Sequence, residues 1–173
     1  MNFNIGIIGV GKMGLSHLAI ANQVEGIQVV AFAEKSNFLR KALSKSTGIE
    51  GYADYREMIQ KEELTAVIIC VPNWLHYETC LYCIDQDLHF FVEKPFTLSH
   101  ETSLEVAKKA DDSNVLGQVG YVNRYNPIFL KAKDLLGQNI IGEVFYYSCE
   151  MTGSVVKKPT KSGWRNDYSM GGG

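Results

Sequence analysis

The sequence predicts an α/β protein with a doubly wound parallel sheet, and three observations support this prediction. Apolar runs of strand length alternate with helical segments along the first two thirds of the chain, which indicates a parallel sheet covered on both faces. A glycine-spaced turn, Gly9-x-Gly11-x-x-Gly14, joins the first strand to the first helix. The alternation then stops. We therefore expect the sheet domain over residues 1–121 and the beginning of an α+β domain over residues 122–173.

The first half of the sheet is predicted by β-branched runs and by the residues that end each helix. Strands are expected at 3–8 and 27–33, where β-branched side chains dominate. Between them, apolar residues at helical spacing predict a helix over 12–22. The next helix, over 38–45, stops before two glycines that mark its end and a turn.

The second half of the sheet follows a short strand at Tyr52 and a helix over 55–60, which Asp54 caps. The uninterrupted apolar runs 66–71 and 88–92 are typical of strands buried on both faces. The remaining elements are a helix over 76–86, a helix over 99–111 whose cap is Ser99, and a closing strand over 115–120.

A different pattern follows the sheet. Asn126-Pro127 is a favoured cap and first-turn pair, so a helix is expected to reach about residue 136. Alternating side chains predict a strand over 142–151, and the polar stretch 152–163 predicts a loop. One helix and one strand cannot bury both of their apolar faces, so we expect this part to be incomplete or covered by a partner.

The composition excludes several classes of function. The 173 residues are 46% hydrophobic and 21% charged, with a formal net charge of −2, as in a soluble globular protein with a real core. This charge offers no basic surface for nucleic acid or for an anionic membrane, and no apolar run is long enough to span a bilayer. The first residues lack the regions of a signal peptide, so a cytoplasmic location is expected.

The four cysteines are Cys70, Cys80, Cys83 and Cys149. Cys80-x-x-Cys83 has the spacing of a redox motif, but it falls inside a predicted helix, where the helix dipole lowers a thiol pKa little. The sequence has no second pair of this kind and no nearby histidines at zinc spacing. We expect small buried side chains, with no disulfide and no metal site.

The glycine-spaced turn predicts a dinucleotide site because it stands between a strand and a helix. Gly9 lets the chain turn off the strand, Gly11 lets a pyrophosphate approach the backbone, and Gly14 lets the helix pack on the strand. The free N–H groups at the start of the helix, which carries Lys12 and Met13, then bind the phosphates.

Glu34 ends the second strand, about 20 residues beyond the last glycine, where a carboxylate holds ribose hydroxyls. Its charge would repel a 2′-phosphate, so NAD is the predicted cofactor. Lys35 and Ser36 adjoin it, and they leave NADP open. The alternative is an ordinary βαβ unit with a glutamate that faces solvent.

Two further strand ends should face the same cleft, since ligands bind outside the carboxyl ends of parallel strands. They are Pro72-Asn73 and Glu93-Lys94-Pro95. Beside a bound cofactor, Lys94 can orient a hydroxyl or carbonyl and share its proton, and Glu93 can pair with it or touch the cofactor. Pro95 is a candidate for a cis peptide bond. The alternative is a solvated surface lysine.

Three other sites have two interpretations each. His76 begins a helix and either contacts the cofactor or serves as a capping or supporting residue. His17 lies on the first helix and either contacts the next loop or the cofactor or simply packs there. Asn123, Arg124 and Tyr125 lie just past the sheet. They either bind a polyhydroxylated or anionic substrate through several donors or form a polar hinge between domains.

These motifs, in this order, resemble those of the Gfo/Idh/MocA oxidoreductases, which include glucose-fructose oxidoreductase and inositol dehydrogenase. The resemblance covers the whole chain. The matching stretches are Gly9–Gly14, Val71-Pro72-Asn73 with His76, Glu93-Lys94-Pro95, residues 123–127 at the domain junction, Gly163-Trp164-Arg165 and Gly171–Gly173.

The resemblance implies a Rossmann domain followed by a substrate domain whose open sheet commonly mediates oligomerisation, so a homo-oligomer is expected. It implies hydride transfer between a nicotinamide and a sugar, cyclitol or sugar-derivative hydroxyl, with Lys94 as the catalytic group. The positions expected to contact the cofactor are Gly9, Gly11, Lys12, Met13, Gly14, Glu34, Pro72, Asn73, His76, Glu93, Trp164 and Arg165, and those expected to contact the substrate are Asn123, Arg124 and Tyr125.

The chain departs from the family pattern at one point. In the family, an Asp and a His follow the triple glycine, and the His usually acts as acid/base, whereas this chain ends first. We therefore expect cofactor binding with impaired or absent turnover, and a truncated form of an active parent. The alternatives are a non-catalytic dinucleotide-binding sensor or partner subunit, and a decayed fragment that exposes the apolar face of residues 142–151.

Overall fold

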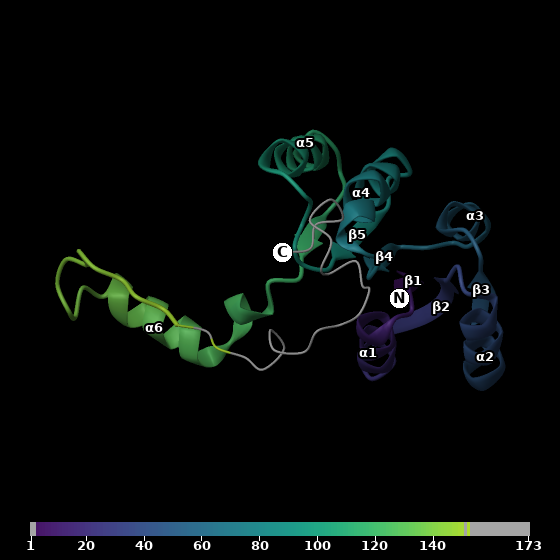
Figure 1. Ribbon diagram of the computed structural model, residues 1–173, viewed down its shortest axis with the longest axis horizontal. Helices are drawn as coiled ribbons and strands as arrows, with labels where there is room; N and C mark the ends of the chain where they lie inside the picture. Colours follow the sequence, from purple (N-terminus) through teal and green to yellow (C-terminus); the bar gives the residue numbers. More distant parts are fainter. Residues whose placement is uncertain (1–2, 151, 153–173) are drawn as a thin grey trace. The chain divides into compact units, whose positions relative to one another are not determined.

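The computed structural model describes residues 3–150 and residue 152, and the chain divides into two compact units. The first unit is Met1–Gly120 and the second is Tyr121–Gly173 (Figure 1). None of the helices in the described part of the chain is long and apolar enough to cross a membrane.

The first unit contains a six-stranded sheet in which every neighbouring pair of strands is parallel. The strands are β1 (Phe3–Ile8), β2 (Ile27–Ala33), β3 (Glu50–Tyr52), β4 (Ala66–Ile69), β5 (His89–Val92) and β6 (Gly117–Val119). Their order in the sheet is β3-β2-β1-β4-β5-β6, so the direction of winding reverses between β1 and β4. The predicted doubly wound Rossmann-type fold is confirmed.

Helices lie on both faces of this sheet, with α1 and α2 on one side and α3, α4 and α5 on the other (Figure 1). Their bounds are α1 (Lys12–Ala21), α2 (Asn37–Thr47), α3 (Tyr55–Lys61), α4 (His76–Asp85) and α5 (His100–Asp111), and the 3₁₀ turn η1 (Asn73–Leu75) precedes α4. Each predicted element of this unit is present, with its ends displaced by a few residues at most.

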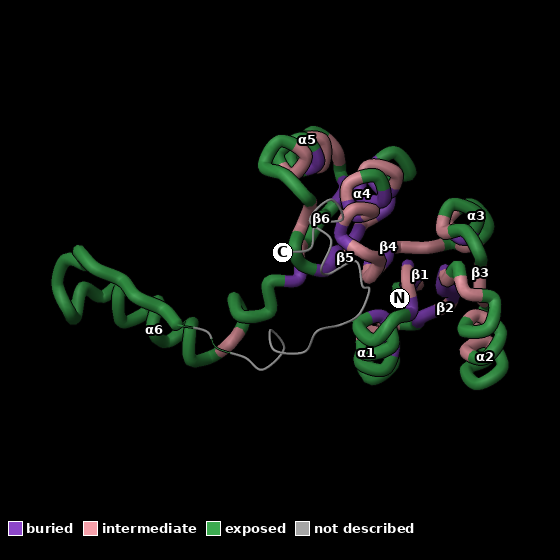
Figure 2. Tube along the Cα trace, viewed as in Figure 1, coloured by how far each residue is buried: buried purple, intermediate pink, exposed green. Residues whose placement is uncertain are grey.

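The core has two parts because each buried strand sends alternate side chains to opposite faces. Ile7 points to the side of α1 and packs in a cluster with Leu18 and Phe32. Its neighbour Ile8 belongs to the cluster on the other side, which includes Met58 of α3. Figure 2 shows the buried positions concentrated on the central strands and on α4, whereas α2 has no buried residue.

The second unit contains the 3₁₀ turn η2 (Val122–Tyr125) and the helix α6 (Pro127–Gly137). The predicted cap is confirmed, because the Asn126 side chain accepts a hydrogen bond from the Ile128 N–H at 2.9 Å. The predicted strand over 142–151 is wrong over residues 142–150, and residue 151 lies outside the described residues. Residues 144–150 form no strand and are exposed, and they pair with none of the described strands.

Candidate active site

Four neighbouring strands end on one row of the sheet. Ile8 of β1 pairs with Ala33 of β2 and with Ile69 of β4, and Ile69 pairs in turn with Val92 of β5. The residues that follow this row are Gly9, Glu34, Cys70 and Glu93. The expected convergence of the glycine turn, the acidic residue and the lysine motif on one edge is therefore confirmed. At about 4.8 Å per strand, the row spans about 14 Å from β2 to β5.

The glycine turn is built for close backbone approach. Gly9 has a φ of +88°, a left-handed conformation that side chains other than glycine rarely adopt. A Cβ at Gly14 would overlap the carbonyl oxygen of Gly9, so only glycine lets α1 start this close to the strand. A Cβ at Gly11 would meet nothing within 4 Å. The backbone at Gly11 therefore faces open space that a ligand can enter.

The start of α1 differs from that of most helices in the structure. Side chains cap α2, α3, α5 and α6, through Ser36, Asp54, Ser99 and Asn126. The N-cap of α1 is Gly11, which has no side chain to accept a hydrogen bond. The first N–H groups of α1, on Lys12 and its neighbours, are thus left for an anion, and the helix dipole favours one there.

Glu34 lies beside this turn with its carboxylate already oriented. Its Oε2 accepts a hydrogen bond from the Val10 N–H at 3.3 Å, and its Oε1 accepts one from the Ser36 N–H at 2.8 Å. Both are backbone donors, so the carboxylate is held by the two loops that border the row. A ribose placed against the glycine turn would meet this negative charge, while a 2′-phosphate would be repelled by it.

Lys94 follows β5 at the other end of the row and is itself exposed. Its backbone N–H donates to Oε2 of Glu93 at 3.3 Å, and Oε1 of Glu93 lies 2.8 Å from Nε2 of His17 on α1. Glu93 is only 8% exposed, so this is a shielded contact between the first helix and the lysine motif. In the described part of the chain, the Lys94 ammonium forms no salt bridge. It is available to a substrate oxygen.

His76 supports the same motif from the other side. It is 1% exposed, its Nδ1 lies 2.9 Å from the Pro95 carbonyl oxygen and 3.0 Å from that of Phe96, and its Nε2 lies 2.9 Å from that of Val71. The ring thus joins the loop after β4 to the loop after β5. Within the loop after β5, the Lys94–Pro95 bond is cis, as the strand-end position suggested. These contacts favour the supporting role over direct contact with a cofactor.

The other predicted site residues divide among three places. Pro72 precedes η1, and Asn73, the first residue of η1, is buried. Asn123, Arg124 and Tyr125 form η2 in the second unit and are exposed. Trp164 and Arg165 lie outside the described residues. His17 is the site residue that sequence reasoning missed. Its only signal is a place on the first helix three residues beyond Gly14, where its side chain reaches Glu93.

The cysteine pair is part of the core. Cys80 and Cys83 are both fully buried on α4, and burial raises the pKa of the Cys83 thiol to about 12. The expectation of small buried side chains is confirmed for this pair and wrong for Cys149, which is exposed. No group of three or more His, Cys, Asp or Glu side chains among the described residues is arranged to hold a metal ion.

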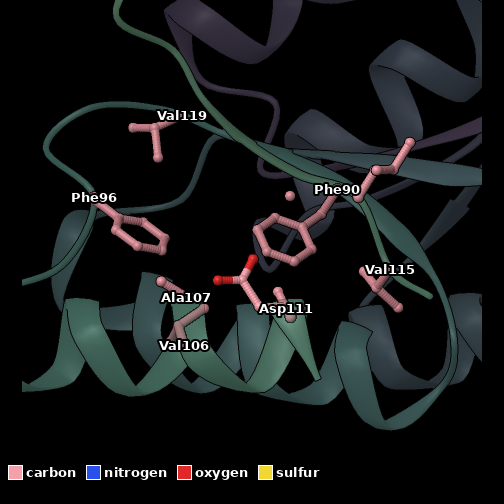
Figure 3. Close-up of a pocket in the computed structure, with 10 residues that line it drawn as sticks. Phe90, Phe96, Val106, Ala107, Asp111, Val115 and Val119 are labelled. Atoms are coloured by element: carbon pink, nitrogen blue, oxygen red, sulfur yellow. The ribbon is translucent and has the colours of Figure 1, made fainter. Parts of the chain in front are cut away.

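A cavity of about 280 Å³ lies between α5 and the strands β5 and β6 (Figure 3). Phe90, Phe96, Val106 and Val115 line it, and the Asp111 carboxylate turns toward it. None of the predicted site residues contributes to its lining. The cavity therefore belongs to the packing of α5 on the sheet and is separate from the row of strand ends.

The parallel sheet, the uncapped glycine turn and the oriented acidic residue define a dinucleotide-binding Rossmann domain. Comparison with known proteins gives the family. The model of the oxidoreductase family with an NAD-binding Rossmann fold, GFO_IDH_MocA, matches residues 3–121. The chain belongs to this family, and the resemblance seen in the motifs is confirmed.

The chain is similar to three longer proteins. Inositol 2-dehydrogenase of Mycolicibacterium gilvum is 31% identical over 86% of this chain and 43% of its own length. The 2,7-anhydro-N-acetylneuraminate hydratase of Mediterraneibacter gnavus is 26% identical over 96% of this chain and 44% of its own. The scyllo-inositol dehydrogenase of Lactobacillus casei, solved with bound NAD(H) and scyllo-inositol, matches with a TM-score of 0.76 and 26% identity, over 83% of this chain and 43% of that one. The chain thus spans less than half the length of these relatives.

Proposed function

We propose that this chain is the cofactor-binding part of an NAD(H)-dependent dehydrogenase that acts on a hydroxyl of a cyclitol, sugar or sugar derivative. The observation that carries the proposal is the row of strand ends, which sets Glu34 and the glycine turn at one end and Lys94 at the other. The relatives that are named inositol dehydrogenases support the cyclitol as substrate class.

The cofactor would lie along this row. The glycine turn and the first N–H groups of α1 would hold the pyrophosphate, and the Glu34 carboxylate would accept hydrogen bonds from the adenosine ribose. The nicotinamide half would then extend toward β4 and β5, where Asn73 and Glu93 are the nearest predicted contacts. When bound, the cofactor supplies the carbon that takes or gives the hydride.

Lys94 would act on the substrate oxygen. Its ammonium donates a hydrogen bond to the hydroxyl or carbonyl oxygen, which orients that carbon and stabilises negative charge as it develops there. His17 and His76 would be positioning residues, since they hold Glu93 and Pro95, the two neighbours of Lys94. Asn123, Arg124 and Tyr125 stay predicted substrate contacts. Assembly into a homo-oligomer and a cytoplasmic location stay predictions.

The first test is a fluorescence titration of the purified chain with NADH and NADPH, repeated for Lys94→Ala. Saturable binding that prefers NADH in both proteins is expected, because Lys94 serves the substrate and not the cofactor. Binding of neither cofactor would contradict the proposal at its base.

The second test follows absorbance at 340 nm with NAD⁺ and either myo-inositol or scyllo-inositol. NADH formation that is lost in Lys94→Ala supports a dehydrogenase. One relative is named a hydratase, and a hydratase would form no net NADH. Cofactor binding without NADH formation would favour the non-catalytic dinucleotide-binding protein.

A further inference from the structure

The turn that joins β2 to α2 is held by an arginine. Nη1 of Arg40 donates to the Glu34 carbonyl oxygen at 2.7 Å and to that of Lys35 at 3.4 Å, and Nη2 donates to Oδ1 of Asn37 at 3.1 Å. All three acceptors are uncharged. The guanidinium therefore bridges the turn that carries the predicted ribose-binding residue, and the planar arrangement of its donors suits several acceptors at once.

The same turn is fixed a second time by the side chain of Glu34. Its two carboxylate oxygens accept from the N–H groups of Val10 and Ser36, and its own N–H donates to the Tyr52 carbonyl oxygen on β3 at 2.9 Å. Backbone and side chain of Glu34 are thus held separately, the backbone by Arg40 and β3, the carboxylate by the two loops. Release of either would let the carboxylate leave its place beside the glycine turn.

The stem of Arg40 is also placed by its surroundings. Arg40 lies in the first turn of α2, where its N–H donates to the Ser36 carbonyl oxygen at 2.9 Å. A Cβ at Gly51 of β3 would lie 2.8 Å from Cγ of Arg40, so the stem occupies the space that the glycine leaves. The side chain runs across β3 toward the turn and is partly buried.

We propose that Arg40 is a positioning residue for cofactor specificity. By donating into the backbone of residues 34–37, it holds the Glu34 carboxylate where the adenosine ribose of NAD(H) binds. Its charge is directed at neutral acceptors of the protein and is not offered to a 2′-phosphate. This inference rests on the proposed function. The opposite assignment, in which Arg40 is itself a ligand of the 2′-phosphate of NADP(H), makes the reverse prediction for the same variants.

The experiment compares NADH and NADPH dissociation constants for the wild-type chain, Arg40→Met, Arg40→Lys and Lys41→Met. Methionine keeps a long apolar stem and a good helix propensity but has no donor. Lys41→Met removes the same charge from the next residue of α2, which is exposed, and serves as the matched control. Circular dichroism and the thermal midpoint confirm that each variant is folded.

We expect Arg40→Met to weaken NADH binding about tenfold, the order expected when a hydrogen-bond network loses a charged member, and to weaken NADPH binding less. Arg40→Lys should recover little, because one ammonium cannot serve three separated acceptors. Lys41→Met should change neither constant. In a Glu34→Gln background, Arg40→Met should have a smaller effect on NADH, since the two residues act through one turn.

Two results would overturn the inference. The first is unchanged NADH affinity in Arg40→Met. The second is a larger loss for NADPH than for NADH together with recovery in Arg40→Lys, which would make Arg40 a phosphate ligand. Failure of the wild-type chain to bind either cofactor would instead contradict the proposed function, so the two failures are distinguishable.

Discussion

The two units of the chain have similar fractions of apolar residues. They differ in how far the side chains of those residues are buried. In the first unit, helices cover both faces of the sheet and fully bury side chains such as Phe32, Ile7 and Val67. In the second unit, no described residue is buried, and Phe145 is 97% exposed. The apolar residues that form the core of the first unit find their packing partners within that unit. Among the described residues of the second unit, no such core forms.

This difference follows from how the two kinds of structure bury surface. A βαβ unit brings its own helix onto its own strands, so the partners of each apolar side chain are close in sequence. A single helix and an extended segment have no such partner within reach. The match covers 43% of the length of each of two relatives in the family.

The largest contrast is expected between Phe32→Ala and Phe145→Ala. Truncation of a fully buried phenylalanine leaves a cavity and should lower the free energy of unfolding by about 3–5 kcal/mol. Truncation of an exposed one should change it by less than about 0.5 kcal/mol. Urea unfolding followed by circular dichroism measures both. An equal loss in the two variants would show that the second unit is packed in solution, and the comparison would be broken.

A smaller contrast is expected between two glycine substitutions, Gly14→Ala and Gly137→Ala. The methyl group at residue 14 would overlap the Gly9 carbonyl oxygen, so α1 must shift away from the strand. We expect a loss of about 1–3 kcal/mol in stability and a strong loss of NADH binding. At Gly137 the methyl group meets nothing within 4 Å, and better helix propensity should stabilise by up to about 1 kcal/mol.

Unfolding curves and NADH titration on the same samples measure this pair. If a folded Gly14→Ala protein binds NADH with wild-type affinity, the close approach of α1 to the strand is not needed for cofactor binding.

The fold of the first unit could be predicted because local signals and tertiary partners agree there. The uninterrupted apolar run that contains β4, the Asp54 and Ser99 caps and the glycine turn each indicate the same arrangement that the sheet requires. The strand expected over 142–151 failed for the converse reason. Alternation of side chains specifies which face a strand would present, but a strand forms only where backbone partners exist.

The candidate site divides in the same manner. Gly9, Glu34 and Lys94 could be found because each ends a strand, and strand ends are visible in the sequence. The contacts of His17 with Glu93 and of Arg40 with the 34–37 turn join side chains to groups on other elements or across a turn. Their geometry depends on how helices rest on the sheet, and no spacing in the sequence encodes it. His76 was visible as a motif residue, but its buried contacts with three carbonyl oxygens were not.

The smallest expected effect is a difference in alkylation rate between the buried cysteines of the first unit and the exposed Cys149 of the second unit. The thiolate is the reactive form, and burial raises the pKa of Cys83 to about 12. At pH 8 the Cys83 thiol is therefore almost entirely protonated, and its burial keeps reagent away in the folded chain. Cys149 is exposed in the second unit. Iodoacetamide should therefore modify Cys149 first.

Mass spectrometry of peptides after timed alkylation measures these rates, with the chain in urea as the control. Cys80 and Cys83 should react at the rate of Cys149 only after unfolding. The sign of the pH effect follows from the same shift. Because the folded state keeps the Cys83 proton that the unfolded chain loses near pH 8.5, stability should fall as pH rises from there toward 12. Rapid modification of Cys80 and Cys83 in the native chain would mean that α4 opens locally, and that the first unit is less uniformly packed than its core indicates.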